Sequence, residues 1–274
     1  MAHDDLADFD VERFTHEKST RTIYRSGTGP AVIVMAEMPG MTPKVMAFAR
    51  RVRDNGFTVI LPHLFGVPGR DSNPEVRGIR GALQDMASSL IPACIDREFA
   101  VFALGKTSPA VVWLRALAAA EHTRCGGPGV GAVGMCFTGG FALAMATEPE
   151  MLAPVLSQPS LPLALRPCDR SALDISDGDL ATVKARCAKE DLQVIGLRFK
   201  GDHFVPAQRF ERLRQELGDS FIGIELEDAD AYNPGPMWPH SVLTENLKDE
   251  PGEPTRDALE QVIDLFRRKL LVSS

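Results

Sequence analysis

The residue of this sequence best suited to covalent chemistry is Cys136. It stands in the run Gly134-Met-Cys136-Phe-Thr-Gly139-Gly140, between a segment expected to form a strand and one expected to form a helix. A strand that turns sharply into a helix exposes the residue at the turn as a nucleophile, and the turn needs small neighbours. A lone free cysteine is more often a small buried hydrophobe, but this setting favours a nucleophile.

The same turn would supply two further aids to acyl transfer. The helix that follows presents the positive end of its dipole beneath Cys136, which favours the thiolate over the thiol. The backbone N–H of Phe137 would point at the oxygen of an attacked carbonyl and stabilise its negative charge. We therefore expect Cys136 to attack a carbonyl carbon and Phe137 to donate to the resulting oxyanion.

A thiolate nucleophile needs a base, and the base needs an orienting carboxylate. Two histidines, His203 and His240, follow Cys136 in the chain. Asp202 follows an expected strand, where ligands meet the edge of a parallel sheet, although it could equally cap the next helix. His240 follows the last expected strand, which gives a known order of nucleophile, acid and histidine. His203 lies beside the acid and could scarcely fold back to it, so we predict Cys136, Asp202 and His240.

Alternating strands and helices must position these side chains. We predict strands over Ala31–Ala36, Phe57–Leu61, Gly129–Val133, Ala153–Ser157, Leu192–Leu197 and Phe221–Leu226. We predict helices from Pro43 to Asn55 and over Ala110–His122, Gly139–Ala146, Pro206–Leu217 and Thr255–Leu270. This alternation predicts one α/β domain over residues 1–274, a doubly wound, mostly parallel sheet with helices on both faces. Residues 1–18 are expected to be a peripheral extension, and 160–190 and 227–239 to be irregular surface segments.

Composition limits the partners. The chain has 30 Lys and Arg against 37 Asp and Glu, a net charge of −7, which argues against nucleic acid or an anionic membrane. Neither a membrane helix nor a signal peptide is expected. The 5 cysteines form no C-x-x-C pair, and the histidines show no metal-ligand spacing. We expect a cytoplasmic protein that acts on a small molecule, with no metal and no cofactor.

Four stretches resemble the dienelactone hydrolase family over roughly residues 20–270. They are Val32–Gly40, Phe57–Gly66, Gly134–Gly140 and Asp202–Ala207. The resemblance implies an α/β-hydrolase fold and a cofactor-free, carboxymethylenebutenolidase-like hydrolase that cleaves a small activated ester or lactone through an acyl-enzyme. It assigns the catalytic triad to Cys136, Asp202 and His240.

The resemblance also implies roles for two residues after the first of these strands. A glutamate at the position of Glu37 holds the resting thiol and moves when substrate arrives, which suits a carboxylate beside a thiol at a dry strand end. A surface charge is the alternative interpretation of Glu37. The backbone N–H of Met38 would be the second oxyanion donor, beside that of Phe137.

The sequence departs from the family at three positions. Thr138 stands where a glycine is usual, and it either narrows the turn or supplies a hydroxyl. His63 replaces an acidic residue and receives no role. Thr244 replaces an arginine that grips the substrate carboxylate, so dienelactone itself need not be the substrate. Candidate anion partners, each more often a solvated or structural charge, are Arg77, Arg80 and Arg97.

Two alternatives to an esterase or lactonase stay open. The missing arginine and Thr138 also suit a catalytically weak binding or regulatory protein on the same fold. A thioesterase or acyltransferase would share the covalent step but accept a different acyl acceptor. The sequence indicates neither the substrate and its pathway nor the oligomeric state, and segment 160–190 bears on specificity if it covers the site.

Overall fold

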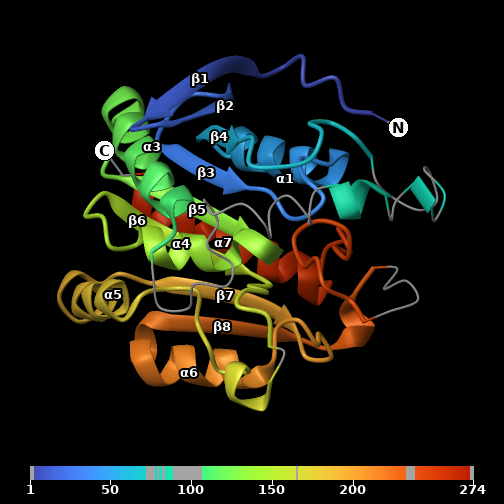
Figure 1. Cartoon of the computed structure of the whole chain (residues 1–274), viewed down its shortest axis with the longest axis vertical. Coiled ribbons are helices and arrows are strands. Elements are labelled where there is room, and N and C mark those ends of the chain that lie inside the picture. Colours follow the sequence, from blue (N-terminus) through green and yellow to red (C-terminus); the bar gives the residue numbers. More distant parts are fainter. Residues whose placement is uncertain are drawn as a thin grey trace.

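The strand-forming segments of the chain join in one mixed sheet. A computed structural model describes residues 3–71, 78, 80–81, 84–88, 107–164, 166–232 and 238–271. The strands are β1 (Asp10–His16), β2 (Ser19–Ser26), β3 (Ala31–Met35), β4 (Thr58–Pro62), β5 (Val130–Met135), β6 (Met151–Ser157), β7 (Val194–Phe199) and β8 (Phe221–Leu226). Their order across the sheet is β1-β2-β4-β3-β5-β6-β7-β8 (Figure 1). Strands β4, β3 and β5 to β8 pair in parallel, whereas β1 and β2 pair antiparallel.

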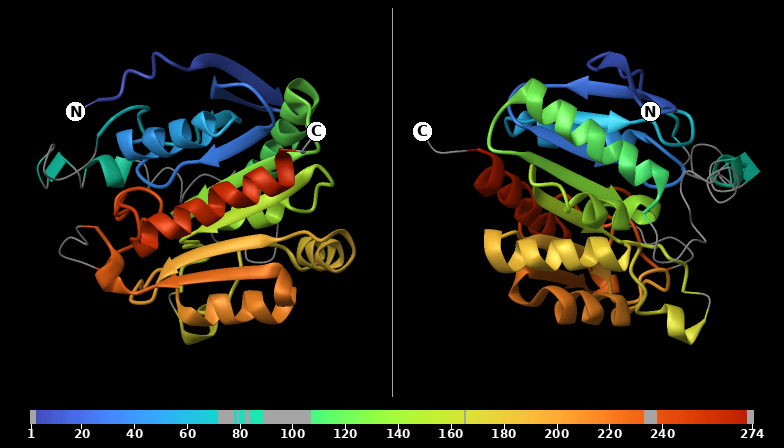
Figure 2. Two further views of the ribbon diagram at one scale, coloured as in Figure 1. Left: turned by 180° about the vertical axis from the view of Figure 1, so that it is seen from behind. Right: turned by 60° about the vertical axis from the view of Figure 1, so that its left-hand side comes forward.

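Helices cover both faces of this sheet. They are α1 (Pro43–Asp54), α3 (Pro109–Cys125), α4 (Gly139–Met145), α5 (Asp177–Glu190), α6 (Ala207–Leu217) and α7 (Pro254–Leu270). Side chains of α3 to α6 pack into one apolar cluster, and those of α1 and α7 pack into the other. Strand β3 contributes side chains to both clusters, because Ile33 packs in the first and Val32 and Val34 pack in the second. Seen from behind, α7 and α1 lie in front of the sheet (Figure 2).

The predicted fold class is confirmed, and each predicted strand and helix is present with its ends shifted by a few residues at most. The strands could be predicted from their apolar residues because most of them are buried along their whole length. Such continuous apolar runs are typical of parallel strands that are covered on both sides.

The prediction that segment 160–190 is irregular is wrong. Segment 160–190 contains the helix α5, whose first turn carries Asp177 and Asp179 and whose N-cap, Ser176, accepts a bond from the backbone of Asp179. These are ordinary start signals of a helix. Segment 1–18, expected to be a peripheral extension, contains β1, which lies at the edge of the sheet.

The N-terminal residues before β1 are tied to helix α1 by charge. The guanidinium of Arg50 contacts the carboxylate of Asp4 at 2.6 Å and that of Asp8 at 2.7 Å. Arginine holds the pKa of the Asp8 carboxyl well below its usual range through these hydrogen bonds, against the opposing effect of burial. The described part of the chain has no helix that is both long and apolar enough to cross a membrane.

Candidate active site

The functional candidates converge because the carboxyl ends of neighbouring strands meet at one edge of the sheet (Figure 1). Met35 of β3 is in register with Gly134 of β5, and Met135 of β5 with Ser157 of β6. The residues that follow these strands therefore lie next to one another. Two of them, Met38 and Cys136, pack in part against the same apolar cluster.

Cys136 occupies a tight turn between β5 and α4. Its φ is +52°, a left-handed conformation that a residue with a side chain adopts only when its surroundings impose it. A Cβ on Gly134 would overlap the carbonyl oxygen of Thr138, and a Cβ on Gly139 would overlap Pro159. Glycine is therefore required at both positions, as predicted from the motif. The Cys136 side chain is half-buried and not sealed in the core.

The buried hydroxyl of Thr138 forms hydrogen bonds within this turn. Its side chain is fully buried. Its Oγ1 accepts a hydrogen bond from the backbone N–H of Met135 at 2.9 Å, and its proton has carbonyl acceptors in Met35 and Met135, both at 3.0 Å. The hydroxyl thus ties the end of β3 to the end of β5. This contact settles which of the two expectations for Thr138 holds: it supplies a hydroxyl.

The structure brings His240 and Asp202 together, although 38 positions separate them in the chain. Nδ1 of His240 lies 2.6 Å from Oδ2 of Asp202, and the Asp202 side chain is buried. The other carboxylate oxygen of Asp202 accepts from the backbone N–H of Phe204 at 2.9 Å. The backbone N–H of His240 donates to Oδ1 of Asn246 at 2.9 Å. Both the acid and the loop that carries the base are therefore held in place.

The sulfur of Cys136 affects the pKa of the same imidazole. Burial favours the neutral ring of His240, but the negative charge of Cys136 and hydrogen bonds with Asp202 and Cys136 outweigh it. Together they raise the pKa of His240 well above its ordinary value. The arrangement therefore favours the protonated ring of His240 beside the sulfur of Cys136.

Ser160 is a neighbour of this pair that the sequence did not predict. Its Oγ lies 3.4 Å from Sγ of Cys136 and 3.4 Å from Nε2 of His240. The one available signal is its place three residues after the end of the buried strand β6.

Glu37 does not hold the resting thiol as expected. Its carboxylate is buried and accepts hydrogen bonds from Nε2 of Gln158 at 3.0 Å, from Oγ of Ser241 at 2.6 Å and from Oγ1 of Thr244. Glu37 does not bind the thiol because its carboxylate is already bound by these three neutral donors. Two of them, Ser241 and Thr244, lie on the loop that carries His240. Thr244, which stands where the family has an arginine, is thus used internally.

The alternative base, His203, packs against an aromatic side chain. Its ring stacks on Trp238 with the ring centroids 4.4 Å apart. Phe204, which is 42% exposed, meets both Trp238 and His240 edge to face, at 5.5 and 5.6 Å. An aromatic surface therefore borders the imidazole.

The remaining candidates have mixed outcomes. Phe137 and Met38 follow Cys136 and Glu37 directly, so their backbones lie at the same edge of the sheet. His63 bonds through Nε2 to the carbonyl of Gly66 at 3.0 Å. Arg80 is exposed. Arg77 and Arg97 lie outside the described residues. Within the described ranges, no group of three or more His, Cys, Asp and Glu side chains is placed to hold a metal ion.

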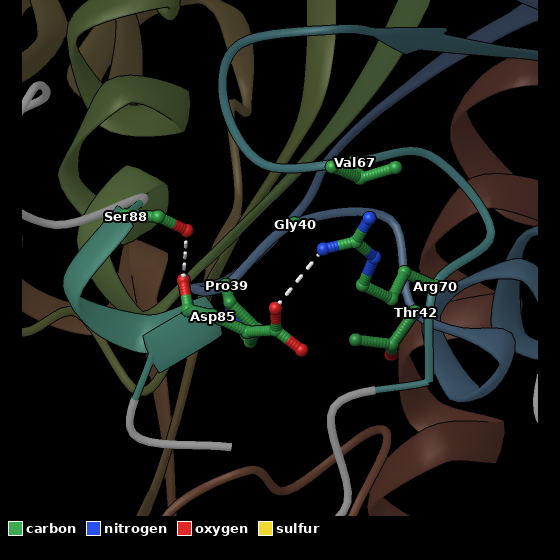
Figure 3. A pocket seen from close by; sticks show the side chains of 7 residues that line it. All are labelled: Pro39, Gly40, Thr42, Val67, Arg70, Asp85 and Ser88. Atoms are coloured by element: carbon green, nitrogen blue, oxygen red, sulfur yellow. Dashed lines mark hydrogen bonds and ion pairs between the residues drawn. The ribbon is translucent and has the colours of Figure 1, made fainter. Parts of the chain in front are cut away.

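A hollow beside the loop after β3 is a separate feature (Figure 3). It is lined by Pro39, Gly40, Thr42, Val67, Arg70, Asp85 and Ser88. Its two charged side chains face each other, with the Arg70 guanidinium 3.1 Å from the Asp85 carboxylate. None of the predicted site residues lines it, and we assign it no role.

The sequence matches the dienelactone hydrolase family over residues 20–269, which confirms the resemblance. A solved dienelactone hydrolase from Anabaena variabilis is 16% identical, with 96% of this chain and 98% of that chain covered and a TM-score of 0.52. No curated protein sequence matches this chain.

Two further solved structures share the fold. A dienelactone hydrolase-like promiscuous phosphotriesterase from metagenomic libraries is 15% identical, with 96% of this chain and 98% of that chain covered and a TM-score of 0.57. A cold-adapted esterase from an Arctic intertidal metagenomic library is 11% identical, with 98% and 100% covered and a TM-score of 0.55. At such identities the likeness establishes the architecture alone.

The role of Thr138 is tested by removing its hydroxyl. Thr138→Val leaves the buried N–H of Met135 without its side-chain acceptor, which costs about 1–3 kcal/mol of unfolding free energy. Thr138→Ser keeps the hydroxyl and loses only a methyl group, about 1 kcal/mol. Urea denaturation measures both. Equal stability of Thr138→Val and wild type would show that this contact does not hold the strand ends together.

The charge state of His240 is tested by nuclear magnetic resonance titration of its ring. In the wild type the ring stays protonated to a higher pH than an ordinary histidine, because the thiolate and Asp202 stabilise the imidazolium. Cys136→Ala removes the charge and the hydrogen bond of the sulfur, so the ring loses its proton at a lower pH. The remaining histidines serve as internal controls. An unchanged His240 titration in Cys136→Ala contradicts the ion pair.

The role of Glu37 is tested by Glu37→Ala, with Thr244→Val as the matched control. Removing the carboxylate leaves three buried donors without their acceptor, and we expect a loss of about 1–3 kcal/mol of unfolding free energy. Thr244→Val removes one donor and leaves the other two bonds to Glu37 intact, so its effect is smaller. Thermal and urea denaturation provide the measurement. If Glu37→Ala is no less stable than Thr244→Val, the carboxylate is not the anchor of this loop.

Proposed function

The chain belongs to the dienelactone hydrolase family and is a hydrolase of ester bonds, and we propose that it cleaves a small activated ester or lactone through an acyl-enzyme on Cys136. The observation that carries this proposal is the convergence of three side chains. Asp202 holds Nδ1 of His240 at 2.6 Å, and the other side of the imidazole interacts with the sulfur of Cys136.

In the first half of the proposed reaction, the Cys136 thiolate attacks the carbonyl carbon. The backbone N–H groups of Phe137 and Met38 stabilise the negative charge that develops on the carbonyl oxygen. The imidazolium of His240 gives its proton to the departing oxygen, and the product is a thioester on Cys136. A thiolate suits esters with good leaving groups, such as enol esters and lactones.

In the second half, His240 changes from acid to base. The thioester sulfur carries no charge, so the largest stabilising influence on the imidazolium is gone and burial again favours the neutral ring. Neutral His240, held by Asp202, then takes a proton from water, and the resulting hydroxide equivalent attacks the thioester. Asp202 orients the ring in both halves of the reaction.

We assign Glu37 a positioning role within this proposal. Its buried charge anchors the loop of His240 through Ser241 and Thr244. The internal use of Thr244, together with the aromatic border formed by Phe204 and Trp238, supports an uncharged substrate over one that carries a carboxylate. Free thiols at Cys125, Cys136 and Cys187 suit the reducing cytoplasm.

The mechanism is tested with Cys136→Ala and a small activated ester such as 4-nitrophenyl acetate. Without the nucleophile, turnover should fall by on the order of 10³-fold or more, while circular dichroism and the melting temperature stay close to wild type. Cys187→Ala, another half-buried free cysteine, is the matched control and should keep full activity. Wild-type turnover in Cys136→Ala would end this mechanism.

The acyl acceptor is tested in the wild type by adding small alcohols and thiols during turnover. A hydrolase should release free acid as the main product at every acceptor concentration. Preferential transfer to the added alcohol or thiol would instead identify an acyltransferase. Absence of any turnover, with a Cys136 that alkylating reagents do not modify, would favour a binding protein on this fold.

A further inference from the structure

Ser160 stands where the nucleophile and the base meet. Its side-chain oxygen is 3.4 Å from Sγ of Cys136 and 3.4 Å from Nε2 of His240, and the residue is 5% exposed. Its backbone N–H also donates to the carbonyl of Cys136 at 3.0 Å. The hydroxyl is therefore fixed beside both reacting atoms.

Arg209 of helix α6 binds the loop that carries Ser160. The guanidinium is 1% exposed and donates to the carbonyl of Pro159 at 2.6 Å and to that of Pro162 at 2.5 Å. These carbonyls flank Ser160 on both sides in the chain. Burial lowers the pKa of Arg209 to about 10, against the opposing charges of Asp174 and Asp202. At neutral pH Arg209 is thus charged, and its hydrogen bonds to the carbonyls of Pro159 and Pro162 hold the loop that carries Ser160.

The proton of the Ser160 hydroxyl has a choice of acceptors. The carbonyl of Gln158 lies 3.2 Å from Oγ and the sulfur of Cys136 lies 3.4 Å from it. A thiolate is the stronger acceptor, because hydrogen bonds to an ionised group are roughly twice as strong as neutral ones. The lone pairs of Oγ can meanwhile accept from the Nε2–H of an imidazolium. When Cys136 is a thiolate and His240 is protonated, the Ser160 hydroxyl can donate to the sulfur while its oxygen accepts from the imidazolium.

We propose that Ser160 is a further catalytic residue, whose hydroxyl donates a hydrogen bond to the Cys136 thiolate and gives it up when the sulfur is acylated. The thiol proton moves from Sγ to Nε2 of His240 when the ion pair forms, while the Ser160 proton stays on its own oxygen. After acylation the sulfur is neutral, and the Ser160 hydroxyl turns to the carbonyl of Gln158. This role rests on the proposed function of Cys136.

Few charged groups act on this arrangement in the described part of the chain. His240 faces the sulfur and Asp202 lies behind the ring. Arg209 lies behind the loop, and Glu37 is engaged by three donors of its own. Removing the Ser160 hydroxyl changes none of these charges, so its effect on the thiolate is separable from theirs.

The test is the rate at which iodoacetamide alkylates Cys136 as a function of pH, followed by mass spectrometry of the peptide that carries it. Ser160→Ala removes one hydrogen bond to the thiolate, so the midpoint of the pH profile should rise by roughly one unit. Ser160→Thr restores the hydroxyl and should return the midpoint toward wild type. Ser160→Gly repeats the loss and carries the test if the alanine variant does not fold.

A matched control separates this role from a structural one. Ser108 is also buried and caps helix α3 by accepting from the backbone N–H of Val111 at 3.2 Å. Ser108→Ala should lower the melting temperature and leave the alkylation midpoint unchanged. A folded Ser160→Ala with the wild-type midpoint overturns the proposal for Ser160 alone. A wild-type Cys136 that is not alkylated at any pH overturns the proposed function and this role with it.

Discussion

The site depends on one steric constraint: the backbone of Thr138 packs directly against Gly134. No side chain fits at Gly134, because the carbonyl oxygen of Thr138 occupies that space. The chain leaves β5 through a left-handed residue, Cys136, before α4 begins at Gly139. On a longer or looser turn the backbone at Cys136 could take several conformations. Here the tight turn fixes the direction in which the side chain leaves the backbone, at the edge of the sheet. The Thr138 hydroxyl then fastens this turn to the end of β3, where Glu37 and Met38 follow.

The second requirement is electrostatic, because the site keeps several charges out of water. A buried charge is costly unless it is paired or hydrogen-bonded, and each charge here has named partners. Asp202 is bound by His240 and by a backbone N–H. Glu37 is bound by side-chain donors from two loops. The protonated ring of His240 is stabilised by Asp202 and by the sulfur of Cys136, against the opposing effect of burial.

The sequence predicted those parts of the site that depend on chain order and local turn chemistry. The glycines beside Cys136 predict its tight turn, and the places of Asp202 and His240 after successive strands predict that the two side chains meet. Ser160 and the environment of Glu37 were missed, because they depend on which side chains face each other once β3, β5 and β6 are in register. Helix α5 was missed for a different reason: its start signals at Ser176 and Asp177 were present, but its segment was dismissed as irregular.

In the proposed reaction the sulfur of Cys136 itself carries the acyl group during turnover. The most direct measurement is rapid acid quenching of the protein during reaction with 4-nitrophenyl acetate, followed by proteolysis and mass spectrometry. We expect an acetyl group on the peptide that contains Cys136, formed within the first turnover and lost at the rate of steady-state hydrolysis. An acetyl group found on a different residue, or steady hydrolysis with Cys136 never modified, would contradict it.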